Sequence, residues 1–108
     1  MIDQEKTPPT SIIAELVLSP RALDRVSLSG PLKKVLAVLH EIPDIEVETH
    51  AMGTNIACDN LDILLTAVKK AHNYLLEQGF ARVVTTLKID ERRDKPDRTL
   101  KDKVEAVK

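Results

Sequence analysis

Residues 82–97, RVVTTLKIDERRDKPD, decide the fold of this chain, because a run of β-branched residues passes without a turn into a dense cluster of charges. Branched side chains lose little freedom on a pleated, half-buried surface, so the segment predicts a strand over Val83–Ile89. The charges that follow, from Asp90 to Lys95, either form a solvated loop after the strand or offer guanidinium groups to an anion or a carboxylate.

The composition limits the class of protein. The 108 residues suffice for one domain, and we expect a flexible N-terminal arm over residues 1–10 and a single domain over residues 11–108. A net charge of -1 gives no field that would draw the protein to nucleic acid or to a membrane, and only Tyr74 and Phe80 are aromatic. Cys58 is the single cysteine, and no segment has the length of a signal or membrane span. We therefore expect a cytoplasmic protein without a nucleic-acid or membrane partner.

The first half of the domain begins with a predicted strand and a predicted helix. Ile12–Leu18 is short and β-branched, and Ser19–Pro20 is expected to end this strand. Ser29–Pro31 is a helix-start signal, because proline has a preset φ and lacks an N–H that the first turn would leave unpaired. The helix should end near Glu41, since the residue before Pro43 is disfavoured in the α region.

The middle of the chain predicts a β-hairpin. Apolar and polar residues alternate over Ile45–Ala51, which is the period of a half-exposed strand, and the polar side includes Glu46, Glu48 and His50. Met52–Gly53 marks the turn, where we expect the glycine to take a positive φ, and Thr54–Cys58 forms the next strand.

A second helix and a short third one are predicted after the hairpin. Asn60 is a good N-cap and Gly79 a good C′ residue for a helix whose apolar stripe is Leu61, Leu64, Leu65, Val68, Ala71, His72 and Leu75. After the last strand, Thr99–Asp102 offers a capping box for a short C-terminal helix with Leu100, Val104 and Val107 at helical spacing.

The order of elements, β-α-β-β-α-β, predicts an α+β ferredoxin-like sandwich: a four-stranded antiparallel sheet with two helices on one face. The other face should then carry an aliphatic and charged mixture: Ile13, Glu15, Val17, Arg82, Val84, Thr86 and Lys88. Covering such a face in a homo-oligomer would bury apolar surface and let Glu15 pair with Arg82 or Lys88. We therefore expect a dimer or a larger assembly.

Three stretches, Met52–Ile56, Val68–His72 and Gly79–Lys95, resemble the thiamine-binding-protein family, the small YkoF-like proteins. The resemblance spans about Ile12 to Val107, and it is most specific where a Thr-Thr strand leads into Asp-Glu-Arg-Arg-Asp-Lys. It implies a ferredoxin-like domain that assembles through its sheets into homodimers or homotetramers. It also implies binding of thiamine, or of its hydroxymethylpyrimidine moiety, without catalysis. The chain departs from the family's usual Glu-Gly-acid step at Ala57-Cys58-Asp59 and in the loop over residues 19–24.

Five residues are candidates for such a ligand site. An aminopyrimidine needs paired hydrogen-bond donors and acceptors, and a thiazolium cation needs a carboxylate or a polarizable surface. The groups that fit are Thr54, Asn55, Thr86 and Asp90, with Met52 as an apolar wall. For Thr54 and Asn55 the alternative role is hairpin geometry, and for Thr86 it is an ordinary place in the sheet.

The remaining polar groups predict no metal site, no cofactor and no enzyme. No spacing typical of metal ligands relates His40, His50, His72 and Cys58. His72 fits a core or interface histidine with one hydrogen bond, and Cys58 fits a small buried hydrophobic residue. No nucleophile has a neighbouring base and no glycine-rich phosphate loop is present, although acid–base work by Glu46, Glu48 and His50 stays an alternative. For Arg92 and Arg93, ion pairs are favoured over phosphate binding.

Together these observations predict a non-catalytic, homo-oligomeric protein that binds a small heterocycle, thiamine or hydroxymethylpyrimidine. The alternative is an oligomeric regulatory or protein-interaction module that does not bind thiamine. The altered step at Ala57-Cys58-Asp59 favours that alternative.

Overall fold

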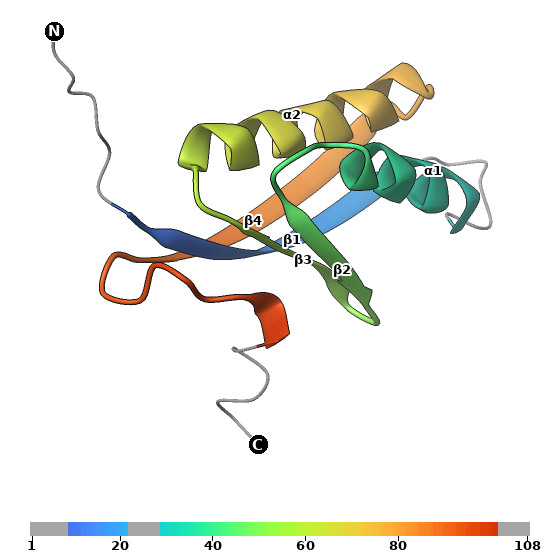
Figure 1. Ribbon diagram of the computed structural model, residues 1–108. Coiled ribbons are helices and arrows are strands. Elements are labelled where there is room, and N and C mark those ends of the chain that lie inside the picture. Colours follow the sequence, from blue (N-terminus) through green and yellow to red (C-terminus); the bar gives the residue numbers. More distant parts are fainter. Residues whose placement is uncertain (1–8, 22–28, 102–108) are drawn as a thin grey trace, which may run out of the picture.

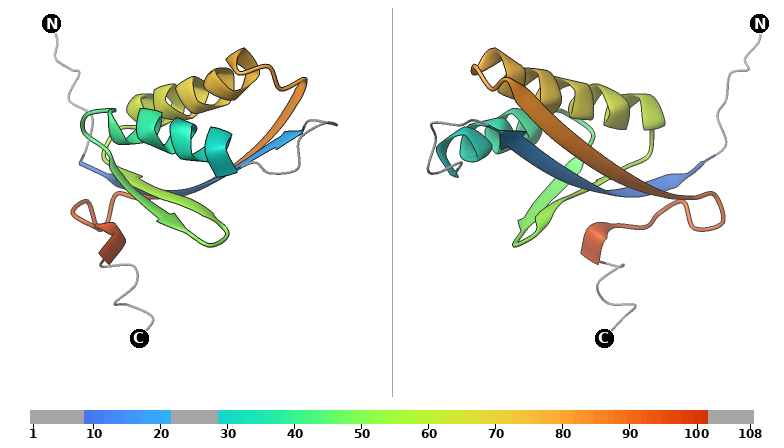
Figure 2. Two further views of the ribbon diagram at one scale, coloured as in Figure 1. Left: turned by 90° about the vertical axis from the view of Figure 1, so that its right-hand side faces the viewer. Right: turned by 180° about the vertical axis from the view of Figure 1, so that it is seen from behind.

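The computed structural model describes residues 9–21 and 29–101 (Figure 1). The elements in chain order are β1 (Ser11–Arg21), α1 (Ser29–His40), β2 (Glu46–His50), β3 (Gly53–Cys58), α2 (Leu61–Glu77) and β4 (Arg82–Arg92). The strands form one antiparallel sheet in the order β2-β3-β1-β4, and both helices lie on the same face of it (Figures 1 and 2). This is the predicted α+β ferredoxin-like fold.

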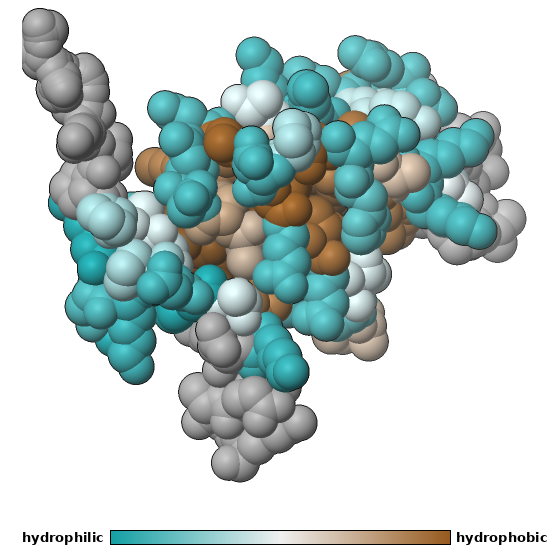
Figure 3. Space-filling model, in the orientation of Figure 1, coloured by the Kyte–Doolittle hydropathy of each residue, from teal (hydrophilic) through white to brown (hydrophobic). Residues whose placement is uncertain are grey.

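The core lies between the sheet and the two helices. Alternation along the strands turns one set of side chains toward the helices, where they meet the buried faces of α1 and α2. Figure 3 shows apolar residues gathered beside the helices and framed by hydrophilic ones. The largest fully buried apolar side chains are Ile12, Leu16, Val35, Leu39, Ile56, Leu64 and Leu75.

The second helix has the predicted ends but a narrower buried face than predicted. The Asn60 side chain accepts a hydrogen bond from the backbone of Ile63 (3.0 Å), and Gly79 follows the C-cap with a φ of +98°. The buried residues are Leu64, Ala67, Ala71 and Leu75. Leu61 and Leu65 are 40% and 46% exposed. Leu65 lies about 100° around the helix from Leu64, which takes it off the line that faces the sheet.

The last strand is longer than predicted, and so is its partner. β4 runs through Asp90 to Arg92, so these charged residues belong to the ladder and not to a loop. β1 continues through Pro20 to Arg21, although the sequence predicts an end at Ser19–Pro20. Beyond Leu16, β1 pairs with β4 alone, and a strand with one unpaired side accommodates a residue that has no N–H.

The turn between β2 and β3 also differs from its prediction. Gly53 does not take a positive φ, which among residues 9–21 and 29–101 occurs only at Asp44 and Gly79. Instead Gly53 pairs with His50 in the ladder, and a Cβ there would lie 3.0 Å from the Leu16 carbonyl oxygen. The position therefore favours glycine because the hairpin approaches β1 closely.

Two smaller observations complete the fold. His72 Nδ1 lies 2.7 Å from Thr85 Oγ1, which joins α2 to β4 and gives His72 its expected hydrogen bond. At the chain ends, Thr10 is buried and its hydroxyl donates to Glu91 Oε2 (2.9 Å). The predicted C-terminal helix lies mainly outside the described residues, of which Leu100 and Lys101 are helical.

Candidate functional site

The face of the sheet that carries no helix presents the mixed side chains that the sequence predicts. Register places Glu15 opposite Lys88 on β4 and opposite Asn55 on β3, and it places Val17 opposite Thr86. These residues alternate with the strand residues that pack into the core. We call this surface the helix-free face.

Residues 93–101 form a strap across one end of this face. After β4 the chain turns back and runs along the side of the sheet opposite the helices (Figures 1 and 2). Leu100 is buried against Ile13 and Ala57, and its backbone N–H donates to Glu46 Oε1 (3.4 Å). The strap therefore reaches from β4, over β1 and β3, to β2.

Arg98 holds the strap to the sheet. Its side chain is 9% exposed and makes four hydrogen bonds to two residues. Nε donates to Ser11 Oγ (2.8 Å), Nη1 to Asp90 Oδ2 (3.1 Å), and Nη2 to the backbone oxygens of Asp90 (3.0 Å) and Ser11 (3.2 Å). Bonds between ionised groups are the strong ones, so this cluster fixes the strap over the ends of β1 and β4.

The role of Arg98 is not predictable from the sequence, because nothing near it in the chain signals its partners. Ion pairs are predicted for Arg92 and Arg93, and Arg92 does form a bidentate ion pair with Asp94. That exposed pair holds the pKa of Asp94 at about 2, chiefly through the hydrogen bond from Arg92.

A cavity of about 340 Å³ lies between the strap and the centre of the helix-free face. We call it the sheet-face pocket. It combines two carboxylates, an amide and an amine with aliphatic walls. Its lining residues are Ile13, Ala14, Glu15, Asn55, Lys88, Asp90 and Leu100.

Glu15, at this pocket, also contacts the hairpin. The backbone N–H of Met52 donates to His50 Nδ1 (3.2 Å), so a neutral His50 carries its proton on Nε2. Nε2 lies 3.5 Å from Glu15 Oε2. The imidazole of His50 thus lies beside the Glu15 carboxylate, while Lys88 lies opposite Glu15 in the ladder.

The structure divides the five predicted site residues between the two faces of the sheet. Asn55 and Asp90 line the sheet-face pocket, and Thr86 lies on the same face but outside the pocket. Thr54 points to the helix side, opposite Leu16, and lines a smaller cavity together with Met52. Adjacent strand residues face opposite ways, so Thr54 and Asn55 do not share a cavity. The pocket residues absent from the prediction are Ile13, Ala14, Glu15, Lys88 and Leu100.

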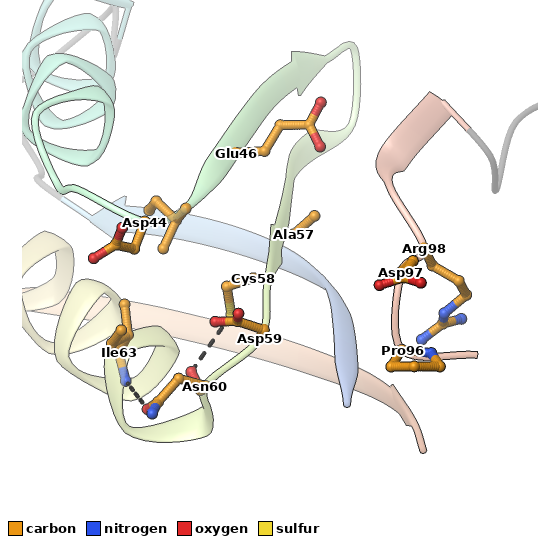
Figure 4. Close-up of a pocket in the computed structure, with 11 residues that line it drawn as sticks. Asp44, Glu46, Ala57, Cys58, Asp59, Asn60, Ile63, Pro96, Asp97 and Arg98 are labelled. Atoms are coloured by element: carbon orange, nitrogen blue, oxygen red, sulfur yellow. Dashed lines mark hydrogen bonds between the residues drawn. The ribbon is translucent and has the colours of Figure 1, made fainter. Parts of the chain in front are cut away.

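A wider cleft of about 580 Å³ contains the Ala57-Cys58-Asp59 step, at the junction of β3 and α2 (Figure 4). The strap, with Asp97, forms the side opposite Asp59 (Figure 4). Burial, the largest cause, raises the pKa of the Cys58 thiol, so the thiol is a poor nucleophile at neutral pH. Despite the acidic lining, no cluster suited to hold a metal ion occurs within residues 9–21 and 29–101.

No helix in the described part of the chain has both the length and the apolar character needed to span a membrane.

Comparison with known proteins identifies the family. A model of the thiamine-binding-protein family matches residues 14–108. A UPF0045 protein of Methanothermobacter thermautotrophicus is 44% identical over 97 residues, which cover 90% of this chain and 96% of the relative. The crystal structure of a hypothetical protein from Methanocaldococcus jannaschii has a TM-score of 0.79 at 39% identity, over 90% of this chain and 95% of that one.

A more distant structure shares the fold alone. It belongs to a thiamine biosynthesis/salvage candidate from Thermotoga maritima, with a TM-score of 0.63 at 22% identity over 91% of this chain and 99% of that one. The family model matches most of the chain, and a relative of known structure has the same fold. The chain belongs to the thiamine-binding-protein family.

Proposed function

We propose that the protein is a non-catalytic, cytoplasmic binding protein for a small heterocycle, thiamine or its hydroxymethylpyrimidine moiety, which it holds in the sheet-face pocket. The observation that carries the proposal is the convergence of Glu15, Asn55 and Asp90 on one cavity, in a chain that belongs to the thiamine-binding-protein family. Of the other predicted site residues, Met52 and Thr54 line a separate cavity and are not part of this proposal.

The groups at the pocket match both parts of thiamine. The Asn55 side chain offers an acceptor and two donors, which an aminopyrimidine edge can use together. Glu15 and Asp90 supply negative charge for a thiazolium cation, and Asp90 is oriented by Arg98. Ile13 and Leu100 supply aliphatic surface for the ring faces.

Calorimetric titration tests the proposal. We expect saturable heat with thiamine or with hydroxymethylpyrimidine, and we expect Asn55→Ala to weaken binding by about five-fold, the equivalent of one hydrogen bond. Asn73→Ala, which removes the same side chain from an exposed position on α2, is the matched control and should bind as the wild type does. Absence of heat with both compounds would favour the interaction module instead.

Charge at the pocket distinguishes the two ligands. Lys88 places a positive charge beside the carboxylates, so Lys88→Gln should tighten thiamine binding and Glu15→Gln should weaken it, each by about two- to five-fold. Hydroxymethylpyrimidine is uncharged near neutral pH, and its affinity should change little in either variant. Equal responses of the two ligands would count against a cation site. Recovery of unchanged ligand after incubation would exclude turnover by Glu46, Glu48 and His50.

We also propose that the protein is a homo-oligomer whose subunits meet on the helix-free face, at the end away from the strap. Val84 is 36% exposed there, and β1 places Val17 nearby, opposite Thr86. Burial of such surface is favourable by about 25 cal/mol per Å². In sedimentation velocity, Val84→Asp should shift the protein to smaller species, whereas Leu76→Asp, at an exposed position of α2, should not.

A further inference from the structure

One edge of the sheet is open. β4 is the last strand in the order β2-β3-β1-β4, so its outer side pairs with no strand among the described residues. Its residues pair one-to-one with those of β1, and they include no bulge and no proline. Arg98 donates to the carbonyl oxygen of Asp90 at one end, so the open part of the edge is Arg82–Ile89. A long, regular edge is a template for another strand, and proteins usually blunt it.

α2 lies above this edge (Figure 2). The contact between His72 Nδ1 and Thr85 Oγ1 fixes which flank of α2 is turned toward β4. Helix residues three or four positions apart share a flank, so the same flank extends from His72 toward both ends of the helix. Its leucines are between 40% and 46% exposed. The members of the flank are Leu61, Leu65, Val68, His72 and Leu76.

β4 adds an isoleucine to this apolar row. Ile89 pairs with Ala14, a core residue, so its side chain lies on the same side of the sheet as α2. Four of the six large hydrophobic residues that are exposed in the described chain thus gather beside the open edge, which makes them a patch. We call the patch and the open edge the α2–β4 flank. The four residues are Leu61, Leu65, Leu76 and Ile89.

The opposite side of β4 carries basic residues next to the open edge. Arg82 and Lys88 lie on the helix-free face, and no ion pair within the described residues involves either of them. Their acidic neighbour Asp90 already pairs with Arg98. A second copy of β4 would bring its own Arg82 and Lys88 to this row, and like charges on neighbouring strands repel. The row therefore favours an acidic strand over another copy of β4.

We infer that the α2–β4 flank binds an extended acidic segment of another protein, which adds to β4 as a fifth strand. The backbone of the segment pairs with Arg82–Ile89. Apolar residues of the segment alternate with acidic ones and pack against Ile89 and the leucines of α2, while the acidic residues lie beside Arg82 and Lys88. Main-chain hydrogen bonds then supply affinity, and the alternation supplies specificity. The inference does not depend on which small ligand the protein binds.

A synthetic peptide, acetyl-Glu-Val-Glu-Val-Glu-Val-Glu-amide, is the probe. Alternation places its valines on one face and its glutamates on the other, and its terminal glutamates are as far apart along a strand as Arg82 and Lys88 are. Amide ¹H–¹⁵N NMR of the full chain should show saturable shifts over Val83–Ile89 and at Leu65. The same peptide with lysine in place of glutamate should bind about ten-fold more weakly, because it meets like charges.

Backbone methylation of the peptide tests the strand pairing itself. N-methylation of the valines blocks one edge of the peptide, and N-methylation of the glutamates blocks the other edge. Only one edge of an added strand meets β4. One of the two methylated peptides should therefore lose about ten-fold or more in affinity, while the other binds as the parent peptide does.

Two substitutions with matched controls locate the site. Leu65→Asp should weaken binding of the acidic peptide by about ten-fold, since a carboxylate replaces an apolar contact. Thr66→Asp adds the same charge at the next position of α2, turned away from β4, and should leave binding unchanged. Arg82→Gln should weaken binding by about three-fold, as expected for a surface ion pair, whereas Arg93→Gln on the strap should not.

Three results would overturn the inference. The first is the absence of a saturable shift in β4 with the acidic peptide. The second is binding of both methylated peptides with the affinity of the parent. The third is a shift of Leu65→Asp to smaller species in sedimentation velocity, because a second copy of the chain would then occupy the α2–β4 flank.

Discussion

Two buried polar side chains, on opposite faces of the same sheet, differ in their hydrogen bonding. The Arg98 side chain is 9% exposed and makes four hydrogen bonds, to Ser11 and Asp90. Thr54 is 7% exposed, and its hydroxyl has no hydrogen-bond partner within the described residues. The first group is satisfied by the fold and fixes the strap. The second has no such partner among the described residues, and burial of an unpaired hydroxyl costs stability.

The largest effect is expected at Arg98. Replacement by Met would remove every hydrogen bond of the cluster and leave Asp90 and Ser11 without this partner beneath the strap. We expect the free energy of unfolding to fall by about 2–3 kcal/mol, a value reduced from that of a fully buried ion pair because Asp90 is partly exposed. Chemical denaturation measures this difference.

Arg93→Met is the matched control for Arg98→Met. Arg93 lies on the same strap but is exposed, so its replacement should change the free energy of unfolding by less than about 0.5 kcal/mol. Equal losses in the two variants would show that the Arg98 cluster does not fix the strap.

Thr85 provides the satisfied counterpart of Thr54 on the helix side. Thr85→Val removes the hydroxyl that bonds to His72 and leaves the imidazole unpaired at that nitrogen. The free energy of unfolding should fall by about 1 kcal/mol. A thermal or urea transition identical to that of the wild type would mean that this hydrogen bond contributes no net stability.

Thr54→Val should change stability in the other direction. The substitution keeps the shape of the side chain and removes a buried hydroxyl that has no partner, so the free energy of unfolding should rise by about 0.5–1 kcal/mol. The same denaturation series measures it. A loss of stability in Thr54→Val would indicate that this hydroxyl does have a hydrogen-bond partner. Thr54 and Thr85 would then not differ in this respect.

The smallest effect on stability is expected for the exposed ion pair of Arg92 and Asp94. This pair serves as a surface counterpart to the buried Arg98 cluster. The carboxyl pKa of Asp94 is lowered from 3.8 to about 2 by Arg92, so its contribution to stability is present above pH 3.8 and is lost as the pH falls toward 2. Carboxyl ¹³C NMR should show a midpoint near 2, and Arg92→Gln should return it toward the ordinary value. An unchanged midpoint in the variant would exclude Arg92 as the cause.

Local patterns in the sequence predict most of the fold. Asn60 and Gly79 mark the ends of α2 because capping is decided by neighbouring residues. The ends of β1 and β4 are harder to predict, since Pro20 and the charged residues after Ile89 enter the sheet only because each strand extends the other. Such pairing between distant segments leaves no local signal.

The candidate site was predictable only in part for the same reason. Asn55 and Asp90 could be chosen for their chemistry, and β-strand alternation alone separates Asn55 from Thr54. Arg98 and Leu100 could not be chosen, because their roles depend on a strap that crosses the sheet. The sequence around these two residues does not indicate which strands they will pack against.

The most direct test is an amide ¹H–¹⁵N NMR titration with thiamine, which reports both faces of the sheet at once. If the sheet-face pocket is the ligand site, saturable shifts should concentrate at Asn55, Lys88 and Asp90, while Thr49 and Thr54 on the helix side stay unchanged. Shifts confined to the helix side, or no saturable shift at any residue, would contradict the proposed function.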